Sequence, residues 1–108
     1  MVLEWTEPAR QDLEEVFQYF DILSHKVAIS YSEELLKAAD RLKQMPEMGP
    51  KEPNLEHLER NYRYVLVLRR YKLIYLYEKE VCSILMVWDC RQNPKLMKDS
   101  DRFESLNL

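Results

Sequence analysis

The sequence predicts a two-layer α+β fold, in which an N-terminal strand and an antiparallel α-hairpin pack on a mostly antiparallel sheet of about four strands. Apolar residues recur at helical spacing in the first half of the chain, and β-branched and aromatic residues form three short runs in the second half. Helices that are separated along the chain from adjacent strands are typical of α+β domains. The 108 residues fit one domain. We place this domain at residues 1–94 and expect a polar C-terminal tail at 95–108.

The chain begins with a short apolar segment, residues 1–5, that predicts a strand. Thr6 stands where a helix N-cap belongs. Pro8 falls in the first turn, where proline is tolerated because the first amides have no intrahelical partner. The first helix should extend to about Leu23, with Asp12 on the face turned to solvent. Its apolar stripe consists of Ala9, Leu13, Val16, Phe17 and Phe20.

A second helix should begin after Ser24, whose hydroxyl can cap the first turn, and it should end near Met45. Pro46 sets this end because proline disfavours helical geometry in the residue before it. The connection between the two helices is so short that they must form an antiparallel hairpin. The segment 46–54 contains three prolines and predicts a loop, which residues 55–59 follow with room for one helical turn.

Three strands are predicted at 62–69, 72–77 and 81–88, where β-branched and aromatic residues are concentrated. The polar residues after the second of these strands suit a turn, whereas the first turn, near Arg70 and Tyr71, has neither Gly nor Asn. The α-hairpin should cover one side of the sheet. The residues that we expect to be largely buried are Leu13, Phe17, Leu35, Leu42, Leu66 and Leu85.

The composition excludes several classes of function. With one glycine, Gly49, the chain has no Gly-rich loop of the kind that cradles a nucleotide. His25 and His57 lie in predicted linkers without other ligands at metal-binding spacing, so we expect no metal and no cofactor. Cys82 and Cys90 are eight residues apart, and one strand could hold both; they would then be too far apart for a disulfide, which indicates two reduced, buried thiols. No signal peptide is recognisable and no run approaches the ~20 apolar residues of a membrane span. These features predict a cytoplasmic protein without a membrane partner.

The formal net charge of −3 is distributed unevenly. Residues 1–59 carry 6 Lys and Arg against 13 Asp and Glu, a net of −7, whereas residues 60–108 carry 10 against 6, a net of +4. The overall acidic balance disfavours a general nucleic-acid binder, but it leaves room for a local basic surface. Arginines and lysines hold phosphates and tyrosines stack on bases, although strand tyrosines are equally at home in a core. The basic and aromatic set comprises Arg60, Tyr62, Arg63, Tyr64, Arg69, Arg70, Tyr71, Lys72, Tyr75, Tyr77 and Arg91.

Four segments carry a family resemblance. Residues 5–19 combine a strand end with a helix that bears Ala, then Asp-Leu, then an aromatic residue. Residues 42–49 contain leucine, then proline, then glycine; residues 71–75 run tyrosine, lysine, two aliphatics, tyrosine; and residues 89–94 place an arginine just past an apolar run. In this order and spacing they resemble the RelE/ParE superfamily of toxins from bacterial type II toxin–antitoxin (plasmid stabilisation) modules, and the ParE-type branch most closely.

The resemblance implies a toxin that a cognate antitoxin protein neutralises. ParE-type members inhibit DNA gyrase, whereas RelE-type members are ribosome-dependent mRNA interferases, which hold the message with basic residues at the scissile phosphate. For an interferase, the corresponding residues of this chain would be Arg63, Lys72 and Arg91. Together with Arg69 they are the candidate binding residues.

The sequence departs from the interferase pattern after Arg91. Interferases tend to place a Tyr or His there as acid or base, whereas this chain continues with Gln92, Asn93 and Pro94. We therefore favour gyrase inhibition and assign no catalytic residue, with an mRNA interferase and a non-toxic protein-binding module as alternatives. Whether the protein is an enzyme, and whether it forms a homodimer or a toxin–antitoxin complex, stay open at this point.

Overall fold

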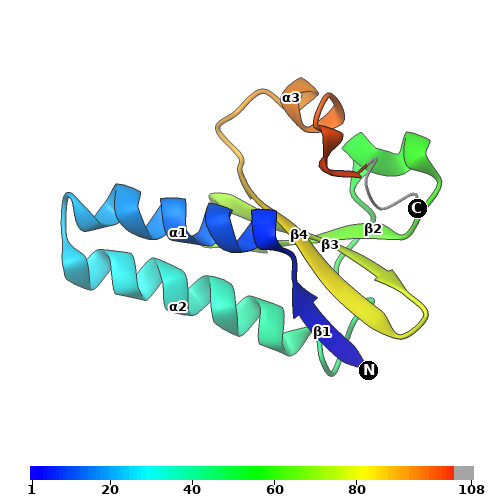
Figure 1. Ribbon diagram of the computed structural model, residues 1–108, viewed down its shortest axis with the longest axis horizontal. Coiled ribbons are helices and arrows are strands. Elements are labelled where there is room, and N and C mark those ends of the chain that lie inside the picture. Colours follow the sequence, from blue (N-terminus) through cyan, green and yellow to red (C-terminus); the bar gives the residue numbers. More distant parts are fainter. Residues whose placement is uncertain (104–108) are drawn as a thin grey trace.

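A computed structural model describes residues 1–103 and confirms the predicted α+β fold. The four-stranded sheet has the order β1-β4-β3-β2, in which β1 is parallel to β4 and the other neighbours are antiparallel (Figure 1). Within the described residues, no helix combines the length and apolarity that a membrane crossing requires. The elements are β1 (Val2–Trp5), α1 (Glu7–Asp21), α2 (His25–Arg41), the 3-10 helix η1 (Pro53–Leu58), β2 (Tyr62–Val67), β3 (Tyr71–Glu78), β4 (Val81–Asp89) and α3 (Lys95–Lys98).

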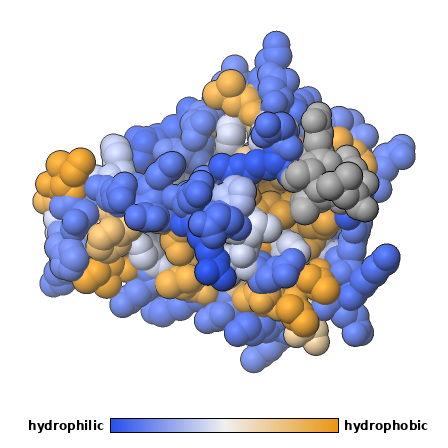
Figure 2. Space-filling view, viewed as in Figure 1, coloured by the Kyte–Doolittle hydropathy of each residue, from blue (hydrophilic) through white to orange (hydrophobic). Residues whose placement is uncertain are grey.

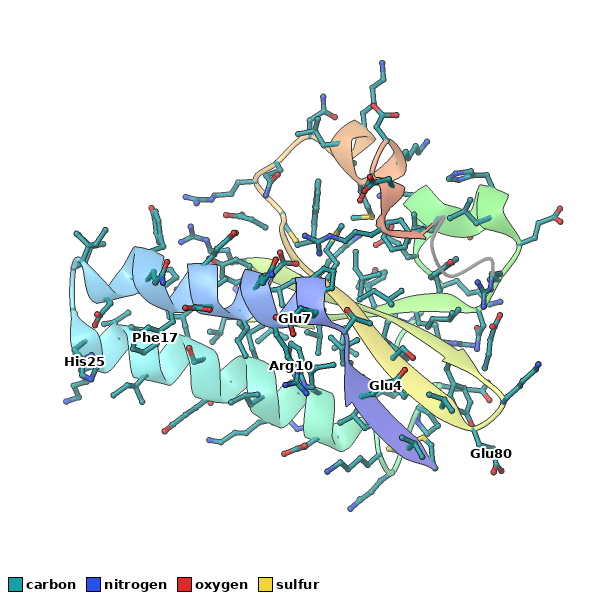
Figure 3. All side chains as sticks on the ribbon, viewed as in Figure 1. Glu4, Glu7, Arg10, Phe17, His25 and Glu80 are labelled. Atoms are coloured by element: carbon teal, nitrogen blue, oxygen red, sulfur yellow. The ribbon has the colours of Figure 1, made fainter. Side chains whose placement is uncertain are left out.

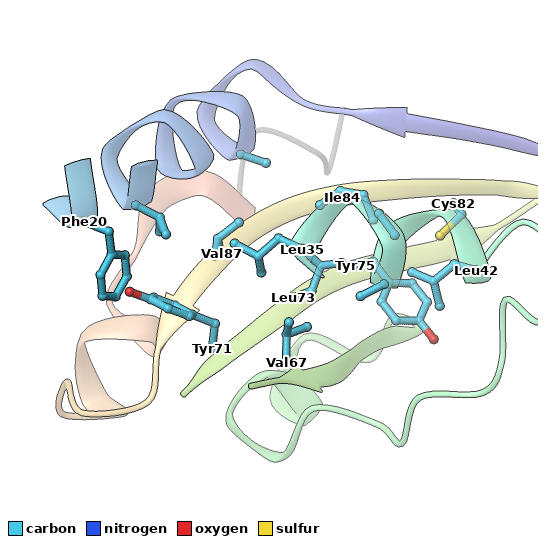
Figure 4. Packing of buried hydrophobic residues seen from close by; sticks show 14 of the residues in the cluster. Phe20, Leu35, Leu42, Val67, Tyr71, Leu73, Tyr75, Cys82, Ile84 and Val87 are labelled. Carbon is cyan, nitrogen blue, oxygen red and sulfur yellow. The ribbon is translucent and has the colours of Figure 1, made fainter. Parts of the chain in front are cut away.

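The α-hairpin covers one face of the sheet, because the apolar stripes of α1 and α2 both turn toward β3 and β4 (Figure 4). Leu35 and Leu42 are buried in this interface, as predicted. Leu13 and Phe17 are only half-buried, but they pack against the same cluster. The buried members of this cluster are Ala9, Val16, Phe20, Ala28, Leu35, Ala38, Ala39, Leu42, Val67, Tyr71, Leu73, Tyr75, Cys82, Ile84 and Val87.

The two helix starts are capped differently. The Ser24 hydroxyl accepts a hydrogen bond from the backbone N–H of Val27 at 3.3 Å, which is the predicted cap of α2. Thr6 occupies the N-cap position of α1, but its hydroxyl donates to the carbonyl of Ile84 at 2.8 Å and so fastens α1 to β4. His25, expected in a linker, begins α2 and packs edge-on against the ring of Phe17 (Figure 3).

The opposite face of the sheet is partly covered by η1 and by residues 95–103, which sequence analysis treats as a polar tail. Met97 and Phe103 are fully or almost fully buried there, so two apolar residues anchor an otherwise polar segment. Leu85 is buried on this face and not under the α-hairpin. The second cluster comprises Leu55, Tyr62, Ile74, Leu76, Leu85, Met86, Trp88, Met97 and Phe103.

The prediction that Leu66 is buried is wrong, because this residue is 55% exposed. It lies on the edge strand β2, and its side chain belongs to neither buried cluster. The β2–β3 turn also differs from the prediction, since its centre is at Leu68 and Arg69, with φ angles of 54° and 56°. The N–H of Arg70 closes this turn by donating to the carbonyl of Val67 at 3.1 Å. Its left-handed geometry suits a tight hairpin but is unusual for residues other than glycine and asparagine.

Candidate functional site

Arg63, the first of the predicted site residues, is used to hold a loop. Its side chain is 15% exposed. The guanidinium donates to the carbonyl of Gly49 at 2.7 Å, to the carbonyl of Glu47 at 3.2 Å and to Oδ1 of Asn61 at 2.9 Å. The Tyr75 hydroxyl holds the same loop by donating to the carbonyl of Pro46 at 2.7 Å. Arg63 therefore fastens the segment after α2 to the sheet.

Lys72 is the counter-ion of a buried carboxylate. Its ammonium lies 2.8 Å from Oε1 of Glu52, whose side chain is fully buried. Oε2 of Glu52 accepts two further hydrogen bonds, from the backbone N–H and the side-chain amide of Asn54, at 2.9 and 3.0 Å. The ammonium also lies 4.2 Å from the ring centroid of Tyr64. These contacts stabilise the loop that leads into η1. The charge of Lys72 is neutralised by Glu52.

Lys72 and Arg91 contact different carboxylates. Lys72 shares its side of β3 with Ile74, which belongs to the second cluster, whereas the neighbouring Tyr71 faces the α-hairpin. Arg91, just after β4, binds Asp89 with nitrogen–oxygen distances of 3.0–3.3 Å. Arg69 is exposed at the β2–β3 turn. Lys72 and Arg91 are thus each paired with a carboxylate of the chain, Glu52 and Asp89 respectively.

A different set of residues converges where α1 meets the start of β3 and the end of β4. They line a groove of about 340 Å³, which we call the Arg70 groove. Helix α1 contributes Asp12, Glu15 and Tyr19, which lie on one helix face because they are spaced by three and four residues. The other polar groups that line it are Arg70, Asp89, Arg91, Gln92 and Arg102.

Arg70 is the best-enclosed cation of this groove. Its side chain is 19% exposed, and its guanidinium carbon lies 5.4, 5.0 and 5.3 Å from the ring centroids of Tyr19, Phe20 and Tyr71. The distance from its Nη2 to Oδ2 of Asp89 is 3.5 Å, the limit of a hydrogen bond. Its Nε is buried and has no hydrogen-bond partner among residues 1–103.

The two arginines set the protonation of their neighbours. Burial raises the pKa of Asp89, but hydrogen bonds from Arg91 outweigh this effect and hold the pKa below its usual range. Hydrogen bonding by Arg70 and then by Arg91 lowers the pKa of the exposed Tyr19 phenol. This end of the groove is thus electropositive, although it contains a carboxylate.

At the other end of the groove, the side chain of Asp12 connects α1 to β4 and to Arg102. Asp12 binds Arg102 at 2.6 and 2.8 Å and accepts a hydrogen bond from the backbone N–H of Val87 at 3.0 Å. Arg102 also donates to the carbonyl of Leu85 at 3.2 Å. Asp12 was expected on the solvent face of α1, but it joins this helix to β4 and to the C-terminal segment.

Arg70 belongs to the basic and aromatic set but not to the predicted site residues, and Tyr19 is the last residue of the first segment that carries the family resemblance. Among the strand tyrosines, Tyr62, Tyr71 and Tyr75 are buried, which supports their alternative interpretation as core residues. Within the part of the chain that the structure describes, no group of three or more His, Cys, Asp or Glu side chains is placed to hold a metal ion.

Comparison with known proteins gives two findings. Residues 3–94 match the family described as the ParE toxin of the type II toxin–antitoxin system parDE. The fold is similar to that of a solved chain from the chromosomal ParDE TA system from P. aeruginosa, with 18% sequence identity, a TM-score of 0.67, and coverage of 82% of this chain and 95% of that one. The search of curated proteins gives no match. Because the family match spans most of the sequence, the chain belongs to the ParE toxin family of type II toxin–antitoxin systems.

Proposed function

We propose that this ParE-family toxin inhibits DNA gyrase in the cytoplasm and that a cognate antitoxin holds it inactive. The observation that carries the proposal is the family match over residues 3–94. The contacts of the candidate cations support it. Arg63 and Lys72 are bound to internal acceptors, and the residues after Arg91 offer no efficient proton donor.

The antitoxin has a suitable surface on the outer side of the α-hairpin. Ile22 and Leu23, at the turn between the helices, are 85% and 76% exposed, and apolar side chains gather at that end of the molecule, on the left of Figure 2. Ile29 and Leu36 are also exposed and lie on one face of α2, seven residues apart. So much exposed apolar surface is a liability for a small monomer, which supports a heterocomplex burying roughly 1,000–2,000 Å².

The test combines expression in bacteria with a purified system. On induction without the antitoxin, cells should form filaments and show DNA damage while their mRNA stays intact. Purified toxin should inhibit supercoiling by gyrase, and the antitoxin should restore it. Cleavage of ribosome-bound mRNA that Arg91→Ala abolishes would overturn gyrase inhibition in favour of an interferase. Growth without any defect at high toxin levels would instead indicate a non-toxic binding module.

A further inference from the structure

Arg70 has more hydrogen-bonding capacity than its surroundings use. A guanidinium presents five N–H donors, and a partly buried one needs acceptors for them. Its carboxylate partner, Asp89, is already engaged by Arg91, which approaches both carboxylate oxygens at 3.0–3.3 Å. The contact of Arg70 with Asp89 is the longer one, at 3.5 Å. The Tyr19 hydroxyl is a further acceptor for Arg70, but the Nε–H has no partner among residues 1–103, so the guanidinium keeps unused donor capacity.

The charged side chains that line the groove fall into two groups, one at each end. Arg102 pairs with Asp12, and Glu15 lies close enough to act on Arg102. At the other end, Arg70 and Arg91 share one carboxylate, which leaves an excess of one positive charge. Arg91 is 62% exposed, so a ligand can reach it from solvent.

The position of Arg70 is fixed before any ligand arrives. The rings of Tyr19, Phe20 and Tyr71 surround the guanidinium, and its stem comes from the tight turn between β2 and β3. A preorganised arginine loses little side-chain entropy on binding. Tyr19 is itself exposed beside the two cations, where its ring offers a face and its hydroxyl a polar group.

We propose that the Arg70 groove binds a phosphate group, carried by a nucleotide or by a nucleic-acid strand. Arg70 and Arg91 would donate to the phosphate oxygens, Gln92 would add its amide at the rim, and Tyr19 would offer its ring to the attached base. Phosphate fits better than a carboxylate, because its larger number of oxygens can accept from both guanidiniums while Asp89 keeps its place. This inference goes beyond gyrase inhibition and concerns the toxin alone.

The experiment uses the full chain and four probes at matched ionic strength: inorganic phosphate, sodium acetate, adenosine monophosphate and a short single-stranded DNA. Binding is measured by calorimetry and by ¹H–¹⁵N spectra of the arginine Nε–H groups. The variants are Arg70→Gln and Arg91→Gln, with Arg10→Gln as the matched control. Arg10 is exposed on α1 and does not line the groove, and its replacement changes the net charge equally.

We expect inorganic phosphate to shift the Nε–H signals of Arg70 and Arg91 in a saturable manner. Arg91→Gln should weaken phosphate binding by about tenfold or more, because one charge-assisted hydrogen bond contributes at least this factor. Arg10→Gln should change it less than about twofold, since exposed charges act weakly at a distance. Arg91→Gln remains informative even if Arg70→Gln disturbs packing, because Arg91 is exposed.

The other probes identify the source of the phosphate. DNA that binds more tightly than the mononucleotide supports a nucleic-acid strand, and equal binding supports a free nucleotide. The proposal is overturned if phosphate shifts neither arginine signal, if acetate binds as tightly as phosphate, or if the control variant weakens binding as much as Arg91→Gln. None of these measurements depends on gyrase, so the two proposals fail separately.

Discussion

Lys72 offers the clearest test of a structural role against a functional one. Lys72→Met keeps the aliphatic stem but removes the charge that neutralises Glu52 in a fully buried position. Breaking a buried ion pair on one side costs about 3–5 kcal/mol, because the other charge remains without compensation. Two hydrogen bonds from Asn54 still support the carboxylate, and the Lys72 side chain is 20% exposed. Both facts reduce the contribution of the ion pair to the free energy of unfolding. We therefore expect a loss of about 2–3 kcal/mol in the free energy of unfolding.

The assay is urea unfolding, with the exposed Lys51→Met as the matched control, for which we expect a change within about 0.5 kcal/mol. The double variant Glu52→Gln/Lys72→Met should recover part of the loss, because no buried charge is left. Toxicity of Lys72→Met should persist at temperatures where the protein is folded. A fully stable variant without toxicity would refute the reasoning and place Lys72 in the functional surface.

Three further predictions concern the sheet and its loops. Gly49→Ala should lower the free energy of unfolding, measured with urea, by about 3 kcal/mol. The reason is that a Cβ atom there would lie 2.1 Å from a backbone carbonyl oxygen of β2. A neutral change would contradict this packing. With a thiol reagent, Cys90 should react faster than Cys82 in the native state, because Cys90 is exposed and Cys82 is buried. Burial raises the pKa of both thiols, that of Cys82 to about 12, so Cys82 should react only on unfolding. Equal native-state rates would contradict this prediction. The hydrogen bond from Arg60 lowers the pKa of Glu78, so the stability that this pair contributes is present above pH 4.5 and is lost as the pH falls. Arg60→Gln should therefore flatten the acid side of the plot of unfolding free energy against pH. An unchanged plot would exclude this pair as the cause of the acid dependence.

The parts of the fold that the sequence predicts well are those with local causes. Helices α1 and α2 follow from apolar spacing, and the Ser24 cap and the loop after α2 follow from single residues with strong conformational preferences. The strand runs are equally local. The prediction that Leu66 is buried is wrong because its exposure depends on strand order. Its strand, β2, lies at the sheet edge, whereas β4 lies in the interior of the sheet. Strand order is set by long-range pairing that composition does not show.

The packing of residues 95–103 is not visible in the sequence for a similar reason. Met97 and Phe103 are two apolar residues within a charged stretch, which is too sparse a pattern to predict burial from sequence. Their burial depends on the second face of the sheet, which the α-hairpin leaves uncovered. Cys90, expected to be buried on the last strand, is exposed because β4 ends at Asp89.

The candidate site shows most clearly why residue type alone does not identify function. Arg63, Lys72 and Arg70 are all partly buried cations on or beside one sheet, and only the first two are among the predicted site residues. The three cations differ in the hydrogen-bond acceptors that are available to them. Arg63 donates to two backbone carbonyls and an amide oxygen, and Lys72 has a buried carboxylate to itself, whereas Arg70 competes with Arg91 for Asp89. Three aromatic rings and Asp89 hold the guanidinium of Arg70, but its Nε has no hydrogen-bond partner among residues 1–103. The proposed phosphate would supply further acceptors, and it directs the search for the target-facing surface to the end of α1 and away from Lys72.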